Sequence, residues 1–140
     1  ATGAYGTCTV NESDVHPQLL ADCHVIAGMP SGLLLLNRNA ALPWFILVPD
    51  TPETELLFVE QVQRNAILAD AERVARYLRA EFDSTKVNVA ALGNQVPQLH
   101  LHVVGRSVGD ACWPKPVWGN LLEEREWSNA QLANIRSEFS

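Results

Sequence analysis

Two histidines two positions apart, His100 and His102, are the residues of this chain best suited to chemistry. They belong to a segment in which polar and apolar residues alternate, as they do on a strand that buries one face. The alternation predicts that Gln98, His100 and His102 share one face of that strand. A neutral imidazole can act as a nucleophile near pH 7, so two imidazoles on one face indicate a catalytic or binding site.

A metal site is a weaker interpretation of the same pair. His-x-His on a strand is a common pair of zinc ligands, but a complete site also needs a carboxylate or a third imidazole, and the motif contains neither. The three cysteines (Cys8, Cys23 and Cys112) form no Cys-x-x-Cys pair. We therefore expect neither a metal nor a cofactor at this site. Metal analysis of the purified protein would separate the two interpretations.

The composition limits the size, location and partners of the protein. A chain of 140 residues with 47% hydrophobic and 19% charged residues fits one globular domain. No apolar run approaches the length of a membrane span, no secretion signal is evident, and few, scattered cysteines suit the cytoplasm. The net charge of −6 disfavours a nucleic-acid polymer as partner. It permits a mononucleotide, because a few backbone N–H groups can hold one phosphate.

The elements that position the histidines can be predicted from the hydrophobic pattern. Apolar segments bounded by turn residues predict five strands, at 23–27, 33–36, 44–48, 87–92 and 98–105, the first three as an antiparallel meander. Apolar residues spaced at three and four predict a long helix over 60–82. Ser128 and Gln131 have the form of a capping box, which predicts a short C-terminal helix. Residues 1–15 show no period, so we expect a flexible arm there and a single domain over 16–140.

The ten residues Gly93-Asn-Gln-Val-Pro-Gln-Leu-His-Leu-His102 resemble the signature of the histidine triad (HIT) proteins, His-φ-His-φ-His-φ-φ, where φ is apolar. They are most similar to a bacterial HIT-like branch in which Gln replaces the first histidine. The similarity extends to 43–49 and to Trp113-Pro114, and so covers residues 16–119. It implies an α+β HIT-like fold, a five-stranded antiparallel sheet with one main packed helix, followed here by the short C-terminal helix. It also implies a homodimer.

The resemblance assigns expected roles to individual residues. His100 matches the nucleophile, which would form a nucleotidyl-imidazole intermediate, and His102 would fix its geometry and contact a phosphate oxygen. Gln98 stands at the position of the first histidine, and an amide cannot supply a proton to a leaving group. The remaining nucleotide-binding residues that we expect are Asn94 and Gln95 at the phosphate, Asn39 at the ribose, and Asn88 as a further match to the family.

Two classes of function remain open on this basis. The leading hypothesis is an enzyme that acts at the α-phosphate of a purine mononucleotide or dinucleoside polyphosphate, as a nucleotidyl hydrolase, transferase or phosphoramidase. The alternative is a nucleotide-binding or sensing protein with little turnover, for which the absent acid at Gln98 is the argument. Turnover of adenosine phosphoramidate or a dinucleoside polyphosphate would separate the two.

Overall fold

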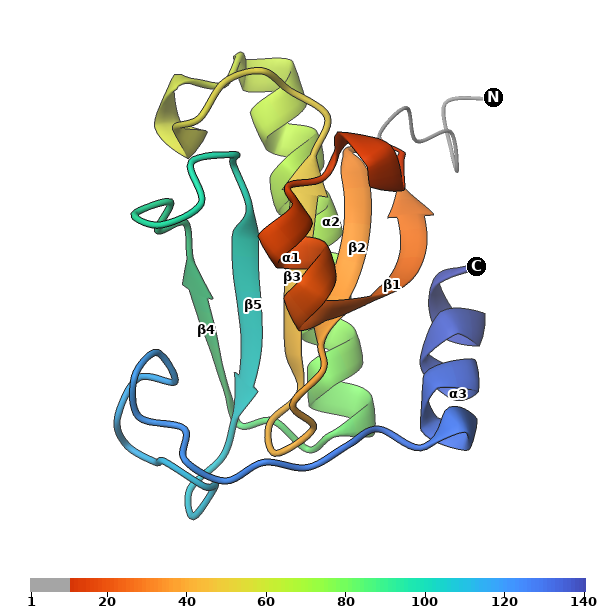
Figure 1. The fold of residues 1–140 in the computed structure, drawn as a ribbon, viewed down its shortest axis with the longest axis vertical. Helices are drawn as coiled ribbons and strands as arrows, with labels where there is room; N and C mark the ends of the chain where they lie inside the picture. Colours follow the sequence, from red (N-terminus) through yellow and green to blue (C-terminus); the bar gives the residue numbers. More distant parts are fainter. Residues whose placement is uncertain (1–10) are drawn as a thin grey trace.

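The computed structural model describes residues 11–140, so most of the predicted arm, residues 1–10, lies outside the described residues. Five strands form one antiparallel sheet in the order β1-β2-β3-β5-β4 (Figure 1). The strands are β1 (Cys23–Met29), β2 (Gly32–Asn37), β3 (Trp44–Pro49), β4 (Lys86–Ala90) and β5 (Leu101–Arg106). The helices are α1 (Pro17–Asp22), α2 (Gln61–Glu81) and α3 (Asn129–Phe139), with short 3-10 helices at Glu12–Asp14 and Leu56–Phe58. The predicted α+β fold class is confirmed.

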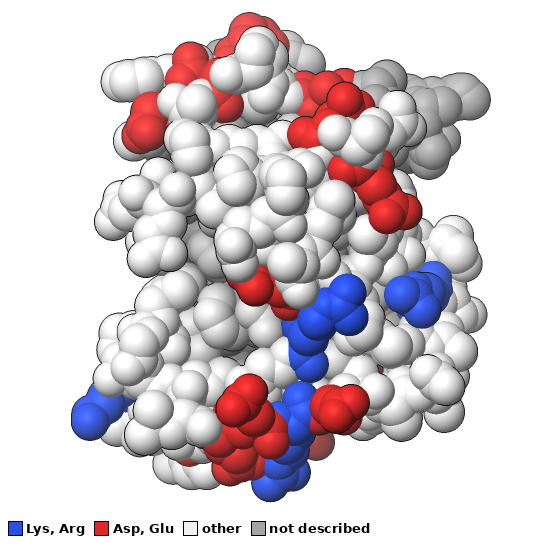
Figure 2. All heavy atoms as spheres, viewed as in Figure 1, with Lys and Arg blue, Asp and Glu red and all other residues white. Residues whose placement is uncertain are grey.

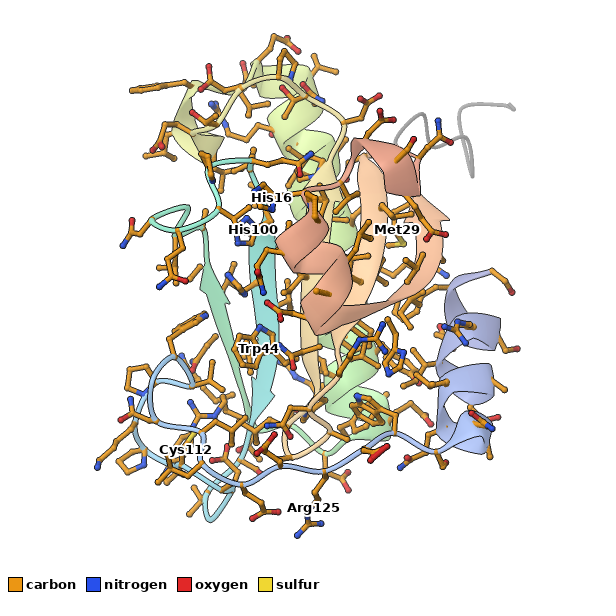
Figure 3. The ribbon with its side chains drawn as sticks, viewed as in Figure 1. His16, Met29, Trp44, His100, Cys112 and Arg125 are labelled. Carbon is orange, nitrogen blue, oxygen red and sulfur yellow. The ribbon has the colours of Figure 1, made fainter. Side chains whose placement is uncertain are left out.

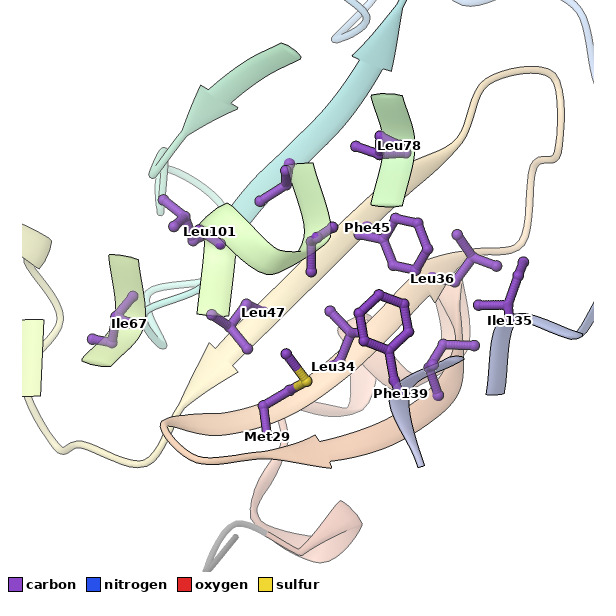
Figure 4. Close-up of a cluster of buried hydrophobic side chains, with 14 of the residues drawn as sticks. Met29, Leu34, Leu36, Phe45, Leu47, Ile67, Leu78, Leu101, Ile135 and Phe139 are labelled. Carbon is purple, nitrogen blue, oxygen red and sulfur yellow. The ribbon is translucent and has the colours of Figure 1, made fainter. Parts of the chain in front are cut away.

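The main hydrophobic core lies between α2 and one face of the sheet. Ile67, Val74 and Leu78 of α2 are fully buried there against alternate residues of β2, β3 and β5 (Figure 4). The core is closed at the β1 side by α3, which begins at the predicted Ser128–Gln131 capping box. Burying such side chains stabilises the fold by about 1.5–3 kcal/mol each, so this layer holds the sheet rigid behind the site.

The opposite face of the sheet carries a smaller layer made by the N-terminal segment. In Figure 1, α2 lies behind the sheet and α1 in front of it. Leu19 of α1 and Val15 before it are buried against Leu33, Leu35 and neighbouring residues of β2 and β3. The end of the segment expected as a flexible arm, at Val15, therefore packs on the domain.

At Gly105, strand β5 packs closely against the end of α2 and the residues that follow it. A Cβ added at Gly105 would stand 2.3 Å from the Ser84 hydroxyl and 3.1 Å from Leu78 Cδ2, so only glycine permits this approach. The close contact of Gly105 with Ser84 and Leu78 holds the C-terminal end of β5 against the core layer. Within residues 11–140, no helix is both long enough and apolar enough to cross a bilayer.

Candidate functional site

His102 projects from β5 on the face that α1 covers. It pairs in register with Ile46 of β3 and with Ala90 of β4. The indole N–H of Trp44, on β3, donates to its Nδ1 over 3.0 Å. Because an indole can only donate, Nδ1 of His102 must accept, and the ring proton of the neutral form lies on Nε2. His102 therefore presents an N–H donor at Nε2.

His100 lies just before β5, which begins at Leu101 and not at Gln98 as the alternation predicted. Its Nδ1 bonds the carbonyl oxygen of Gln98 over 2.8 Å. A carbonyl oxygen only accepts, so Nδ1 carries the proton and Nε2 carries the lone pair. The backbone thus holds His100 in the tautomer that a nitrogen nucleophile requires.

The two imidazole rings lie close together, and their Nε2 atoms differ: that of His102 carries a proton and can donate, whereas that of His100 carries a lone pair and can accept. Their ring centroids are 4.9 Å apart at an interplanar angle of 70°, and the residues are 7% (His100) and 6% (His102) exposed. Burial, and to a smaller extent the neighbouring His100, lowers the pKa of His102 from its ordinary 6.5 to about 4. His102 is therefore neutral at physiological pH. Neither Nε2 atom has a partner among residues 11–140, which leaves both available to a ligand.

A cavity of about 420 Å³ opens in front of both histidines. One wall is the turn Gly93-Asn94-Gln95, and another is α1, through Gln18, Leu19 and Asp22. Gly93 has a φ of +69°, which its lack of a Cβ allows. The backbone N–H groups of Asn94 and Gln95 make no hydrogen bond within residues 11–140 and can serve a ligand. The volume suits a ligand of nucleotide size.

The cavity is almost uncharged. Asp22 is its one charged lining residue among those described, and no Lys or Arg lines it. On the same face of the molecule, Asp and Glu lie mainly toward the two ends, while a few charged residues, Lys or Arg among them, lie near the middle (Figure 2). Any phosphate held here must therefore be bound by neutral donors, namely imidazole, amide and backbone N–H groups.

The side chain of Gln98 does not enter this cavity. Its Oε1 accepts from the backbone N–H of His16 over 2.7 Å, and its Nε2 donates to the carbonyl of Asp14 over 2.8 Å. In Figure 3, His16 and His100 lie beside one another at the beginning of β5. The expectation that Gln98 shares a strand face with the histidines is wrong, because the chain is not yet extended into β5 at this position.

Asn39 and Asn88 are bound elsewhere and do not line the cavity. The Asn39 amide donates to the carbonyl of Glu123 and accepts from the N–H groups of Ala41 and Arg125. The Asn88 side chain accepts from the Arg106 guanidinium over 3.1 Å. Both expected ligand contacts therefore need correction, because each amide is engaged with the protein itself. The structure brings together His100, His102, Asn94 and Gln95.

Several lining residues were not predicted from the sequence. Asn37 at the end of β2 lines the cavity in place of Asn39, two positions away. Trp118 comes from the loop after β5 and places its ring 5.2 Å from that of His102. Pro17 after His16 was a signal for the start of α1, since proline favours the first helical position. Nothing local in the sequence indicated Asn37 or Trp118.

The structure also bears on the metal interpretation and on the end of β5. Among residues 11–140, no three His, Cys, Asp or Glu side chains gather around a possible metal position. Arg106, the last residue of β5, pairs with Asp110 over 2.7 Å, so it bonds an acidic neighbour. Cys112 also contacts its guanidinium. This pair fastens the loop that carries Trp118 to the strand that carries His102.

Comparison with known proteins identifies relatives over most of the chain. A family model described as the HIT domain matches residues 18–109. A histidine triad protein from Bradyrhizobium japonicum is 36% identical, with a TM-score of 0.81 over 89% of this chain and 92% of that one. One from Marinobacter aquaeolei VT8 is 34% identical, with a TM-score of 0.80 over 89% and 90%.

A third solved relative, a histidine triad protein from Sinorhizobium meliloti 1021, is 29% identical, with a TM-score of 0.80 over 94% of each chain. No curated protein is significantly similar in sequence. The paired imidazoles, the sheet that carries them and the match over residues 18–109 lead to one conclusion. The chain belongs to the histidine triad family.

Proposed function

We propose that this protein is a nucleotidyl hydrolase or transferase that acts at the α-phosphate of a nucleotide through His100. The observation that carries the proposal is the tautomer of that ring. Its Nδ1–H is engaged with the Gln98 carbonyl, and the lone pair on Nε2 is available to the cavity. A fixed neutral imidazole with a free lone pair is a competent nucleophile near pH 7.

The proposed reaction has two displacements at phosphorus. In the first, the Nε2 lone pair forms a bond to the α-phosphorus, and the bond to the leaving group breaks with its electron pair. In the second, water or an acceptor hydroxyl attacks phosphorus and loses its proton to solvent, the P–N bond breaks, and its electron pair returns to Nε2. His102 donates its Nε2–H to a phosphate oxygen, and the N–H groups of Asn94 and Gln95 add further donors. The leaving group takes its proton from solvent.

The rest of the cavity suits a nucleoside. Leu19, Ile46 and Val96 offer apolar surface for a base, and Asn37 and Asp22 offer acceptors for ribose hydroxyls. We propose a purine mononucleotide or dinucleoside polyphosphate as the ligand, with no requirement for a metal or other cofactor. A cytoplasmic location remains a prediction.

Incubation with adenosine phosphoramidate or a dinucleoside polyphosphate tests the proposal. We expect release of AMP, and rapid quenching at neutral pH should trap a covalent adduct whose mass exceeds that of the protein by one nucleotidyl group. His100→Ala should remove both the adduct and the turnover while leaving thermal unfolding unchanged, since loss of a nucleophile costs several orders of magnitude in rate. Normal turnover by His100→Ala would contradict this mechanism.

A binding or sensing protein with little turnover is the second candidate. One observation favours it: the cavity contains no third histidine, and its one carboxylate, Asp22, comes from a different element, α1, rather than from the histidine segment. In that case AMP should stabilise the protein in a thermal-shift titration. The quench experiment would then show neither adduct nor product.

We also propose a homodimer. Strand β4 has a free edge in the sheet, and exposed apolar side chains lie beside it: Leu57 and Leu92 line one small cavity near His100, and Val89 is half exposed on β4 itself. A free edge next to exposed apolar surface is a typical place for strand pairing between subunits.

A further inference from the structure

The side-chain oxygen, the side-chain nitrogen and the backbone carbonyl of Gln98 each make a hydrogen bond. These bonds join segments that are far apart in the sequence. Its side-chain amide bonds the backbone of Asp14 and His16, more than eighty residues away, over 2.8 and 2.7 Å. Its own carbonyl accepts from Nδ1 of His100. One residue thus contacts both the N-terminal segment and the ring proposed as nucleophile.

The geometry of the amide matches these partners. The chain is extended at Val15, so the carbonyl of Asp14 and the N–H of His16 point to the same side, as in a strand. A side-chain amide presents one acceptor and one donor side by side and can bond both groups at once. An imidazole directs its two nitrogens apart and cannot do so, and a carboxylate has no donor for the Asp14 carbonyl.

The segment held in this way leads directly into a wall of the cavity. His16 is the N-cap of α1, and its Nδ1 accepts from the N–H of Gln18. Gln18, Leu19 and Asp22 of α1 then line the cavity. A helix of six residues is not stable by itself, so its position depends on the burial of Leu19 against the sheet and on the contacts at its ends. Arg38 holds the C-terminal end through Ala21 and Asp22, and Gln98 holds the N-terminal end.

We infer that Gln98 is a positioning residue, which joins the N-terminal segment to the base of the His100 strand and so places the α1 wall of the nucleotide cavity. We call the two hydrogen bonds from the Gln98 side chain to Asp14 and His16 the Gln98 clamp. The inference rests on the proposed function for the identity of the ligand, but not for the clamp. It gives the glutamine a role that does not involve proton transfer. It also predicts that Gln98→His, which cannot form both bonds, weakens the cavity rather than restoring an acid.

Two variants test the clamp. Gln98→Glu keeps the acceptor for His16 but places a carboxylate oxygen against the Asp14 carbonyl, and Gln98→Ala removes both bonds without adding charge. Gln131→Glu, at the start of α3, is the control with the same change of charge far from the cavity. If Gln98→Glu does not fold, Gln98→Ala carries the test.

The first measurement is amide hydrogen exchange, which needs no substrate. We expect the N–H groups of His16, Leu19 and Leu20 to exchange about tenfold or more faster in both Gln98 variants, while that of Val103 in β5 is unchanged. Exchange at His16 equal to that of the wild type would overturn the clamp. This outcome is independent of whether the protein binds or cleaves nucleotides.

The second measurement separates positioning from chemistry. With adenosine phosphoramidate as substrate, we expect KM to rise about tenfold in Gln98→Ala with kcat within about twofold, because α1 binds the nucleotide and does not contact the reacting bond. A fall in kcat at unchanged KM would overturn the inference, since Gln98 would then act on the reaction itself. A wild type without turnover would refute the proposed function alone, and the exchange data would still decide on the clamp.

Discussion

At the scale of single residues, the indole of Trp44 decides which nitrogen of His102 carries the proton. Trp44→Phe removes the donor to Nδ1 but keeps an aromatic ring of similar shape. We expect kcat to fall about tenfold, the effect of one hydrogen bond, because His102 can then adopt the tautomer that presents a lone pair to the phosphate. Nitrogen NMR of the imidazole should show both tautomers in the variant.

The control for this substitution is Trp113→Phe. Trp113 lies over the Arg106 guanidinium and does not line the cavity. Its replacement should change kcat by less than about twofold, because Trp113 does not line the cavity that holds the reacting groups. Equal losses in the two variants would mean that general packing, and not the bond to His102, explains the effect.

The pKa of His102 makes the stability of the protein depend on pH. Its folded-state value of about 4 lies below the ordinary 6.5, so the unfolded chain binds the proton more tightly. Stability is therefore unaffected above pH 6.5 and falls as the pH drops toward 4. Between pH 7 and pH 5, we expect the wild type to lose about 2 kcal/mol more than His102→Gln, as measured by urea unfolding. Parallel curves for the two proteins would contradict this pKa.

At the scale of elements, the end of β5 is joined to the loop after it by a buried ion pair. Arg106 and Asp110 have side chains only 1% and 6% exposed. Arg106→Met would leave a buried carboxylate without its partner, so we expect a loss of about 3–5 kcal/mol in the free energy of unfolding. Arg76→Met is the control, because its pair with Glu72 is exposed and should contribute at most about 1 kcal/mol. A small effect at Arg106 would mean that Asp110 reaches water.

The elements themselves could largely be predicted from the sequence. The 21-residue helix α2 has a regular apolar face, and four of the five strands, β1 to β4, begin and end within two residues of the predicted positions. The start of β5 was placed too early, because alternation continues through Gln98 although the backbone there is irregular. The strand period alone does not distinguish an extended loop from a paired strand.

The candidate site was predictable only where its residues are close in sequence. His100, His102, Asn94 and Gln95 belong to one continuous motif. Gln98 bonds His16, and Asn39 bonds Glu123, each more than eighty residues away, and no local pattern specifies such pairs. Asn37 lines the pocket at the end of β2 because the Asn39 side chain is hydrogen-bonded to the backbone of Glu123 and Arg125. The sequence alone does not show which of the two amides makes those bonds.

At the scale of the whole molecule, the proposed homodimer can be tested at its surface. We expect sedimentation at tens of micromolar to give twice the chain mass of 15.4 kDa. Leu57→Asp places a charge on the apolar surface beside β4 and should produce a monomer. Leu122→Asp is the matched control, since Leu122 is 89% exposed elsewhere, and it should leave the dimer intact. A monomeric wild type would refute the assembly.

The nearly uncharged cavity has a consequence for the kinetics of encounter. The protein carries a net charge of −6, Asp22 lines the cavity, and no Lys or Arg among residues 11–140 lines it. A nucleotide phosphate is therefore repelled as it approaches, and dissolved salt screens that repulsion. We expect stopped-flow measurements to show AMP associating about twofold faster at physiological than at low ionic strength, whereas uncharged adenosine shows no such change. Phosphate sites built on lysine or arginine behave in the opposite way, so slower association with added salt would reveal a cation in the path of the ligand.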